Sequence, residues 1–161
     1  MIEFFPSKIY SIKLEKDSGT SLMRLKENTL KKDHLSTELT EKRFIGRVGE
    51  SDFKIISSVV GKGAFCVLQG NIDASTGSGT VSIAIHKAFR TLISKWCLLP
   101  FSIVVFCLFK GNWSSAFSLL AFVLIIRFII IEILFKTLSR NSLDELVKVL
   151  GVAYLAEEEA E

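Results

Sequence analysis

His86 and the glycine-flanked Lys62 are the side chains best suited to chemistry in this 161-residue chain. A histidine titrates near neutral pH, so His86 is a candidate proton carrier or ligand. No second ligand, nucleophile or paired carboxylate accompanies it, and a contact with a carbonyl group or a lipid headgroup explains it more simply. A pocket joining His86 to Asp52 or Asp73 would instead favour an enzyme. We therefore expect no catalytic residues.

Two glycine-rich turns, residues 61–63 and 77–79, resemble phosphate-binding loops in composition. A phosphate loop needs a glycine-rich turn that leads into a helix N-terminus. Both turns here connect predicted strands, so hairpin geometry explains them. Lys62 and Phe65 are, with His86, the candidate contacts for a ligand or a protein partner.

The cysteines Cys66, Cys97 and Cys107 are odd in number and have no CxxC or Cys/His spacing. We expect neither a disulfide framework nor a metal site, and no cofactor.

Two uncharged apolar arms, residues 96–109 and 113–126, are separated by only three residues. Each arm has 14 residues, against the roughly 20 that a membrane-spanning helix needs. Extension to Thr91 and to Phe135 gives normal lengths if a few charges are tolerated. A soluble helical bundle is the alternative, but its helices would keep a polar face, and these arms have none. The sequence predicts a two-helix transmembrane hairpin.

Basic residues gather at the open end of this hairpin, while Lys110 alone marks its tip. Because Lys and Arg stay on the cytoplasmic side, we expect a multi-pass protein with both termini cytoplasmic. Lys95 and Arg127 each lie sixteen residues from Gly111, so they should anchor the hairpin at one depth. Arg127 and Glu132 are each expected to pair with Lys95, with another protomer or with headgroups. The predicted anchoring or helix-pairing residues are Arg90, Lys95, Lys110, Arg127, Glu132 and Lys136.

The remaining sequence predicts an α+β fold, with a small antiparallel sheet and one or two short helices. Alternating residues predict strands near residues 9–14, 44–48, 53–60, 65–72 and 80–85, and few β-formers occur in the helix expected over 20–30. Ser142 and Glu145 form a capping box for an amphipathic helix that ends at Gly151. This helix either covers the sheet or lies among headgroups, and the acidic end is a solvated tail. The expected divisions are a cytoplasmic domain at 1–87, the hairpin at 88–136 and the C-terminal helix and tail at 137–161.

Short motifs in the predicted strands precede His86 and the hairpin, and with them the chain resembles a family of uncharacterised bacterial membrane proteins. The resemblance covers roughly residues 44–135. Members of the family often have Asn-Ser-Phe and a Pro in the segment that corresponds to 63–67, and this chain keeps only Phe65. The resemblance implies the bacterial cytoplasmic membrane but no reaction. The matching residues are Phe44, Gly46, Val48, Phe53, Ile55, Phe65, Gly70, Gly79, Thr80 and His86.

The expected function is therefore non-enzymatic: a membrane-anchored protein whose sheet engages a partner protein, a lipid headgroup or a small ligand. The alternative is a membrane-permeabilising effector built from oligomerised hairpins, of a defence or toxin type. The net charge is +3, and much of the basic excess flanks the hairpin, where anionic lipids are the expected counter-charges. The expected partners are the bilayer, further copies of the chain and a protein, but not nucleic acid.

Overall fold

The computed structural model describes residues 5–15, 17–33, 35, 40–59 and 65–158, and it confirms the α+β class. The chain forms two compact units, one of Met1–His86 with Thr137–Glu161 and one of Lys87–Lys136. The first holds the sheet and the second a helical hairpin. The elements are β1 (Ser7–Leu14), α1 (Ser18–Glu27), β2 (Thr29–Lys31), β3 (Phe44–Val48), β4 (Asp52–Ser57), β5 (Cys66–Ile72), β6 (Ser78–Ile85), α2 (Lys87–Phe109), α3 (Trp113–Ile125), a π-helical segment (Ile126–Ile130), α4 (Ile131–Leu150) and β7 (Val152–Glu158).

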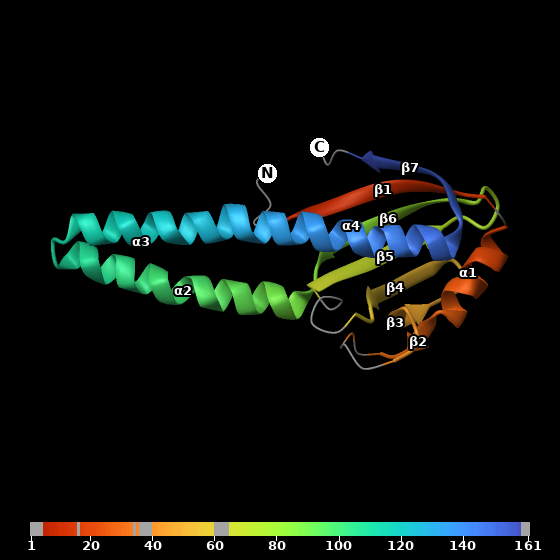
Figure 1. Ribbon diagram of the computed structural model, residues 1–161, viewed down its shortest axis with the longest axis horizontal. Coiled ribbons are helices and arrows are strands. Elements are labelled where there is room, and N and C mark those ends of the chain that lie inside the picture. Colours follow the sequence, from red (N-terminus) through yellow and green to blue (C-terminus); the bar gives the residue numbers. More distant parts are fainter. Residues whose placement is uncertain (1–4, 16, 34, 36–39, 60–64, 159–161) are drawn as a thin grey trace. The chain divides into compact units, whose positions relative to one another are not determined.

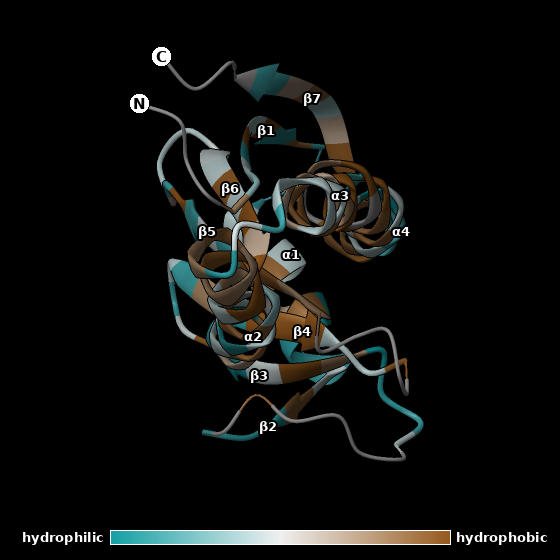
Figure 2. Ribbon diagram, turned by 90° about the vertical axis from the view of Figure 1, so that its left-hand side faces the viewer, coloured by the Kyte–Doolittle hydropathy of each residue, from teal (hydrophilic) through white to brown (hydrophobic). Residues whose placement is uncertain are grey.

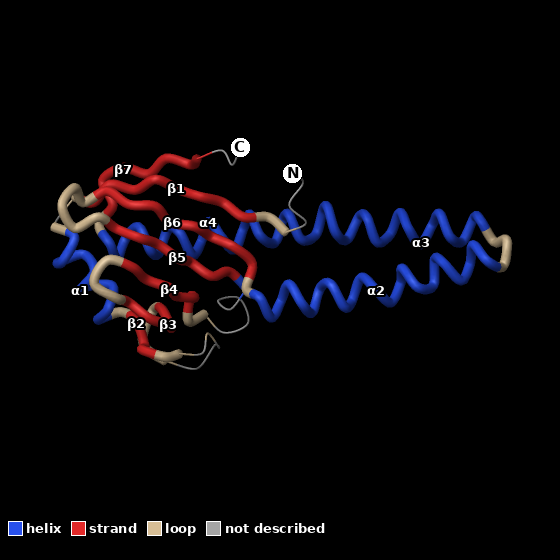
Figure 3. Tube along the Cα trace, turned by 180° about the vertical axis from the view of Figure 1, so that it is seen from behind, coloured by secondary structure: helices blue, strands red, loops and turns tan. Residues whose placement is uncertain are grey.

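The sheet has seven strands in the order β2-β3-β4-β5-β6-β1-β7 (Figure 3). It is larger than the small sheet expected, and it is mixed because β2 runs parallel to β3. The expected antiparallel sheet was therefore wrong in this detail. The predicted strand pair at 65–72 and 80–85 is confirmed, since Cys66 pairs with Ile85 and Ile72 with Gly79.

The first helix is shorter than predicted, because α1 ends at Glu27 and Thr29 begins β2. The side-chain amide of Asn28 donates to the Arg24 carbonyl at 2.9 Å, and the Thr29 hydroxyl donates to the Leu25 carbonyl at 2.6 Å. The Asn28 backbone N–H also donates to the Arg24 carbonyl, at 3.1 Å. Side-chain and backbone donors therefore both satisfy carbonyl groups in the last turn of the helix. Residues 29–31 can then pair with β3.

Most of the core lies on one face of the sheet, although Ile45 and Ile56, which pair with each other and alternate to the other face, are also fully buried. Strand residues alternate across a sheet, and the inward positions are nearly inaccessible to solvent. Figures 1 and 3 place the C-terminal part of α4 across this face. Buried side chains from α1 and α4 complete the core, while the opposite face exposes polar residues such as Lys54 and Gln69. The core includes Ile12, Leu22, Leu25, Phe53, Ile55, Leu68, Ile83, Leu143, Leu146 and Leu150.

The helix expected to start at Ser142 was placed wrongly. Ser142 lies inside α4, which begins at Ile131 and follows α3 and the π-helical segment without interruption. The reason is that no glycine or proline occurs between Trp113 and Leu150. Gly151 ends the helix as predicted, with a φ of 68°.

The prediction of a solvated acidic tail was wrong for Glu157 and Glu158. Both residues belong to β7, Val152–Glu158, which pairs with β1. Lys8 Nζ lies 2.5 Å from a carboxylate oxygen of Glu157. This hydrogen bond raises the pKa of Lys8. The prediction failed because the open edge of β1 offers backbone partners that local sequence does not reveal. Glu159 and Glu161 lie outside the described residues.

In the second unit, α2 and α3 are joined by a tight turn. Gly111 adopts a φ of 71°, and the Asn112 side chain accepts a hydrogen bond from the Ser115 backbone at 3.4 Å. The ammonium group of Lys110 lies 5.7 Å from the centre of the Phe106 ring. The α3 arm continues into the π-helical segment that contains Arg127.

Gly70 leaves room for the buried ring of Phe53, with which it pairs across β4 and β5. A Cβ atom at Gly70 would lie 2.4 Å from the Phe53 ring. We expect Gly70→Ala to reduce the free energy of unfolding by about 1–3 kcal/mol, since the packed ring cannot move aside freely. Chemical unfolding of the full chain in detergent micelles measures this loss.

Asn71→Ala is the matched control, because Asn71 is the next residue and is exposed. It should change stability by less than about 0.5 kcal/mol. Equal midpoints for Gly70→Ala and the unaltered chain would contradict the packing described for Phe53.

Candidate functional site

The structure brings two of the sequence candidates together. Phe65 precedes β5 and His86 follows β6, and the His86 backbone N–H donates to the Phe65 carbonyl at 2.9 Å. Phe65 is buried and His86 half-buried. Burial lowers the pKa of His86, and the nearby positive charge of Lys54 lowers it further. Lys62 lies outside the described residues.

His86 does not join a carboxylate from Asp52 or Asp73. Asp73 follows β5 and Asp52 begins β4, whereas His86 follows the opposite end of β6. The Asp73 carboxylate accepts hydrogen bonds from the Ser75 hydroxyl at 2.7 Å and the Ser75 backbone at 2.8 Å, and these lower its pKa. The pocket that would have favoured an enzyme at His86 is therefore not formed by these residues.

The described residues offer little other reactive chemistry. They contain no group of three or more histidine, cysteine, aspartate or glutamate side chains placed to hold a metal ion. Cys66 is buried in the sheet unit, and burial raises the pKa of its thiol to about 12. A thiol held in its protonated form is a poor nucleophile.

Sequence reasoning missed a polar cavity of about 390 Å³ in the sheet unit. It is lined by the end of β4 and by α4, and two of its lining residues, Ser57 and Ser142, are buried. The Ser57 hydroxyl accepts a hydrogen bond from the Val59 backbone at 3.4 Å. The Ser142 hydroxyl has no partner within the described part of the chain. Buried hydroxyl groups normally find one, so this cavity is suited to a polar ligand.

The rim of this polar cavity carries charges of both signs. Asn141, Asp144, Glu145 and Lys148 line it from a single face of α4, at spacings of three and four residues. This spacing is visible in the sequence and could have identified the face. The partner strand could not have been identified, because β4 lies far away in sequence.

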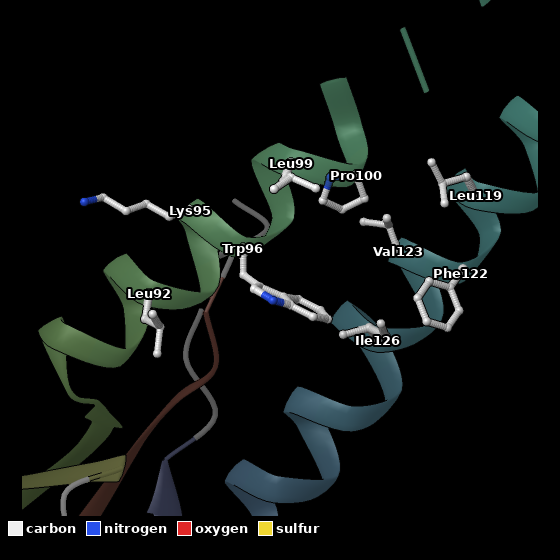
Figure 4. Close-up of a pocket in the computed structure, with 9 residues that line it drawn as sticks. All are labelled: Leu92, Lys95, Trp96, Leu99, Pro100, Leu119, Phe122, Val123 and Ile126. Atoms are coloured by element: carbon white, nitrogen blue, oxygen red, sulfur yellow. The ribbon is translucent and has the colours of Figure 1, made fainter. Parts of the chain in front are cut away.

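A second cavity, apolar and about 400 Å³ in volume, lies between α2 and α3 (Figure 4). Pro100 lies inside α2 and lines it, as do side chains from both arms. Lys95 lies at its margin and extends away from it. The apolar lining residues include Trp96 and Leu99 from α2 and Leu119, Phe122 and Val123 from α3.

The predicted anchoring residues are spread along the second unit. Arg90, Lys95, Glu132 and Lys136 are exposed, and Lys110 occupies the turn at the tip. The side chain of Arg127 lies outside the described part of the chain. That Arg127 and Lys95 lie at the same depth in the membrane therefore stays a prediction. Lys95 and Ile126, the first residue of the π-helical segment, line the same cavity.

One helix in the described part of the chain, α2, is long and apolar enough to cross a membrane, and α3 is apolar but has only 13 residues. No family model, curated protein or solved structure matches the chain.

The lowered pKa of His86 gives a testable pH dependence. The folded protein binds a proton at His86 less readily than the unfolded chain, so this group contributes stability above about pH 6.5 that is lost as the pH falls. We expect an NMR titration of His86, in a His34→Gln chain with one histidine, to give a pKa below about 6.5. Lys54→Gln should raise that value, because it removes the neighbouring positive charge.

Lys13→Gln is the control, because it removes a cation at the far end of the sheet, where Lys13 pairs with Ser78. It should leave the His86 titration unchanged. A pKa above that of a free histidine would show that His86 has a carboxylate partner instead.

Proposed function

We propose that this chain is a membrane-anchored, non-enzymatic binding protein. The observation that carries the proposal is the exposed apolar surface of the hairpin. Among the described side chains of α2 and α3, only Val104 and Ala116 are buried. Figure 2 shows hydrophobic colouring around both arms when they are viewed near their ends. A water-soluble protein rarely exposes so large an apolar surface, whereas a bilayer accommodates it.

The charge distribution supports one orientation of this anchor. Residues 87–136 contain six cations and a single carboxylate, Glu132, and only Lys110 lies at the tip. Trp113 adjoins the tip, and Trp96 adjoins Lys95 toward the open end. Tryptophan and cationic side chains favour the two membrane interfaces. The tip therefore faces away from the cytoplasm, with the sheet unit on the cytoplasmic side.

The binding part of the proposal is the polar cavity bounded by Ser57 and Ser142. Asp144 and Glu145 attract a cationic group, and Lys148 attracts an anionic one. The ligand chemistry that fits is a small zwitterion with an ammonium group and an acidic group. Because α4 begins at Ile131 and ends at Leu150, it belongs to both units. A ligand on its C-terminal half acts on a helix that continues into the hairpin.

Membrane topology tests the anchor. In a chain with its three cysteines replaced by alanine, Lys110→Cys marks the tip and Ala74→Cys marks the exposed β5–β6 turn. We expect a membrane-impermeant maleimide to label the tip cysteine in intact cells. It should label the turn cysteine only after lysis, because the bilayer separates the two. Labelling of both sites in intact cells, or release of the protein by alkaline washing, would contradict the anchor.

Ligand binding tests the cavity. O-phosphoethanolamine carries both an ammonium and a phosphate group, and we expect it to raise the unfolding temperature of the full chain in nanodiscs. Glu145→Gln and Lys148→Gln should each weaken its binding by about tenfold, because each removes one charged contact. Glu50→Gln, a carboxylate outside the cavity, is the control. No stabilisation by the probe, or equal effects of all three variants, would remove the cavity from the proposal.

A pore-forming effector is the second candidate, and Glu132 favours it. Its carboxylate is exposed on an apolar stretch, between the exposed Ile129 and Ile133. A charged side chain is costly in the apolar part of a bilayer, and this cost falls when the side chain faces another protomer or water. Dye release from liposomes containing the protein, reduced by Glu132→Leu, would replace the anchor proposal with this one. Tight liposomes and a small oligomer support the binding protein.

A further inference from the structure

We propose that the apolar cavity between α2 and α3 holds an acyl chain of an anionic phospholipid, whose headgroup pairs with Lys95. This inference rests on the proposed membrane insertion and goes beyond it, because it names a site and a lipid class. At about 400 Å³, the cavity falls within the size range of pockets for small ligands.

The cavity exists because the two arms do not close on each other at this level. Pro100 has no backbone N–H, so it cannot donate to the Trp96 carbonyl one turn earlier. Trp96 and Leu99 line the cavity, yet they are 61% and 67% exposed. Side chains at a closed helix interface would be buried. Figure 4 shows Trp96 reaching from α2 toward Ile126 across the open space.

The surrounding chemistry selects the occupant. Water is a poor filler, since the cavity walls offer few polar partners. A lipid tail matches the walls, and Lys95 at the margin extends away from them. In the proposed complex, its ammonium group pairs with the headgroup while the tail occupies the cavity. Six cations and one carboxylate in residues 87–136 leave this unit strongly positive. Charge complementarity therefore favours an anionic headgroup over a zwitterionic one.

The chain provides its own probe for this site, because it has two tryptophans and one of them lines the cavity. In the Trp113→Phe chain, Trp96 is the only tryptophan. Nanodiscs of phosphatidylcholine receive a minor fraction of lipid with brominated acyl chains, as either phosphatidylglycerol or phosphatidylcholine. Bromine quenches tryptophan fluorescence on contact.

We expect the brominated phosphatidylglycerol to be enriched about fivefold over the brominated phosphatidylcholine at Trp96. This is the preference expected from the attraction between one cation and an anionic headgroup. Lys95→Gln should remove the enrichment, and Lys110→Gln, which makes the same charge change at the tip, should not. Val123→Phe, which fills the cavity, should reduce quenching by both lipids.

The failures are distinguishable. No quenching by either lipid overturns the membrane insertion itself. Equal quenching by the two lipids leaves the insertion in place and overturns the anionic lipid site. Enrichment that survives Lys95→Gln also overturns the site, because it then reflects the general positive charge of the hairpin. Protection of Trp96 that depends on protein concentration assigns the cavity to a second copy of the chain and overturns the inference as well.

Discussion

The structure depends on one uninterrupted helical run. From Trp113 to Leu150 no residue breaks the helix, so α3, the π-helical segment and α4 follow one another until Gly151. The character of the run changes along its length. Its first part is apolar on all sides, while its last part is amphipathic, with Leu143 and Leu146 buried and Asp144 and Lys148 exposed. One continuous helical run therefore carries two kinds of surface, one apolar on all sides and one amphipathic. The side chains determine which environment favours each part.

The two cavities follow the same division. The hairpin cavity is lined almost entirely by hydrocarbon, and its lining includes Pro100, which cannot donate a backbone hydrogen bond within α2. The cavity beside Ser57 is lined by hydroxyl groups and charges. Each can hold only a ligand that matches its walls, because an unpaired polar group in the first, or an unmatched charge in the second, would be costly. A lipid tail and a small zwitterion, the ligands proposed for the two cavities, meet these conditions.

Much of the sheet could be predicted from local patterns. Phe44 to Val48 and the strand pair ending at Ile72 and Ile85 alternate clearly, and a strand with one packed face imposes that alternation. The failures occurred where pairing is non-local. Thr29 was assigned to a helix, although β3 supplies its partner. Glu157 and Glu158 were taken for part of a solvated tail, although they belong to β7 and β1 supplies their partners. The capping box at Ser142 is a local signal that a helix already in progress overrides.

The sequence by itself determined the α+β class, the two apolar arms with their turn at Gly111, and the end of the last helix at Gly151. These features follow from side-chain chemistry and backbone freedom, which act within a few residues. Only the tertiary structure decided that the first and last strands are neighbours, and that Ser57 meets the Ser142 face of α4. Those contacts join segments far apart in the chain, so they depend on how the whole core packs and leave no local trace.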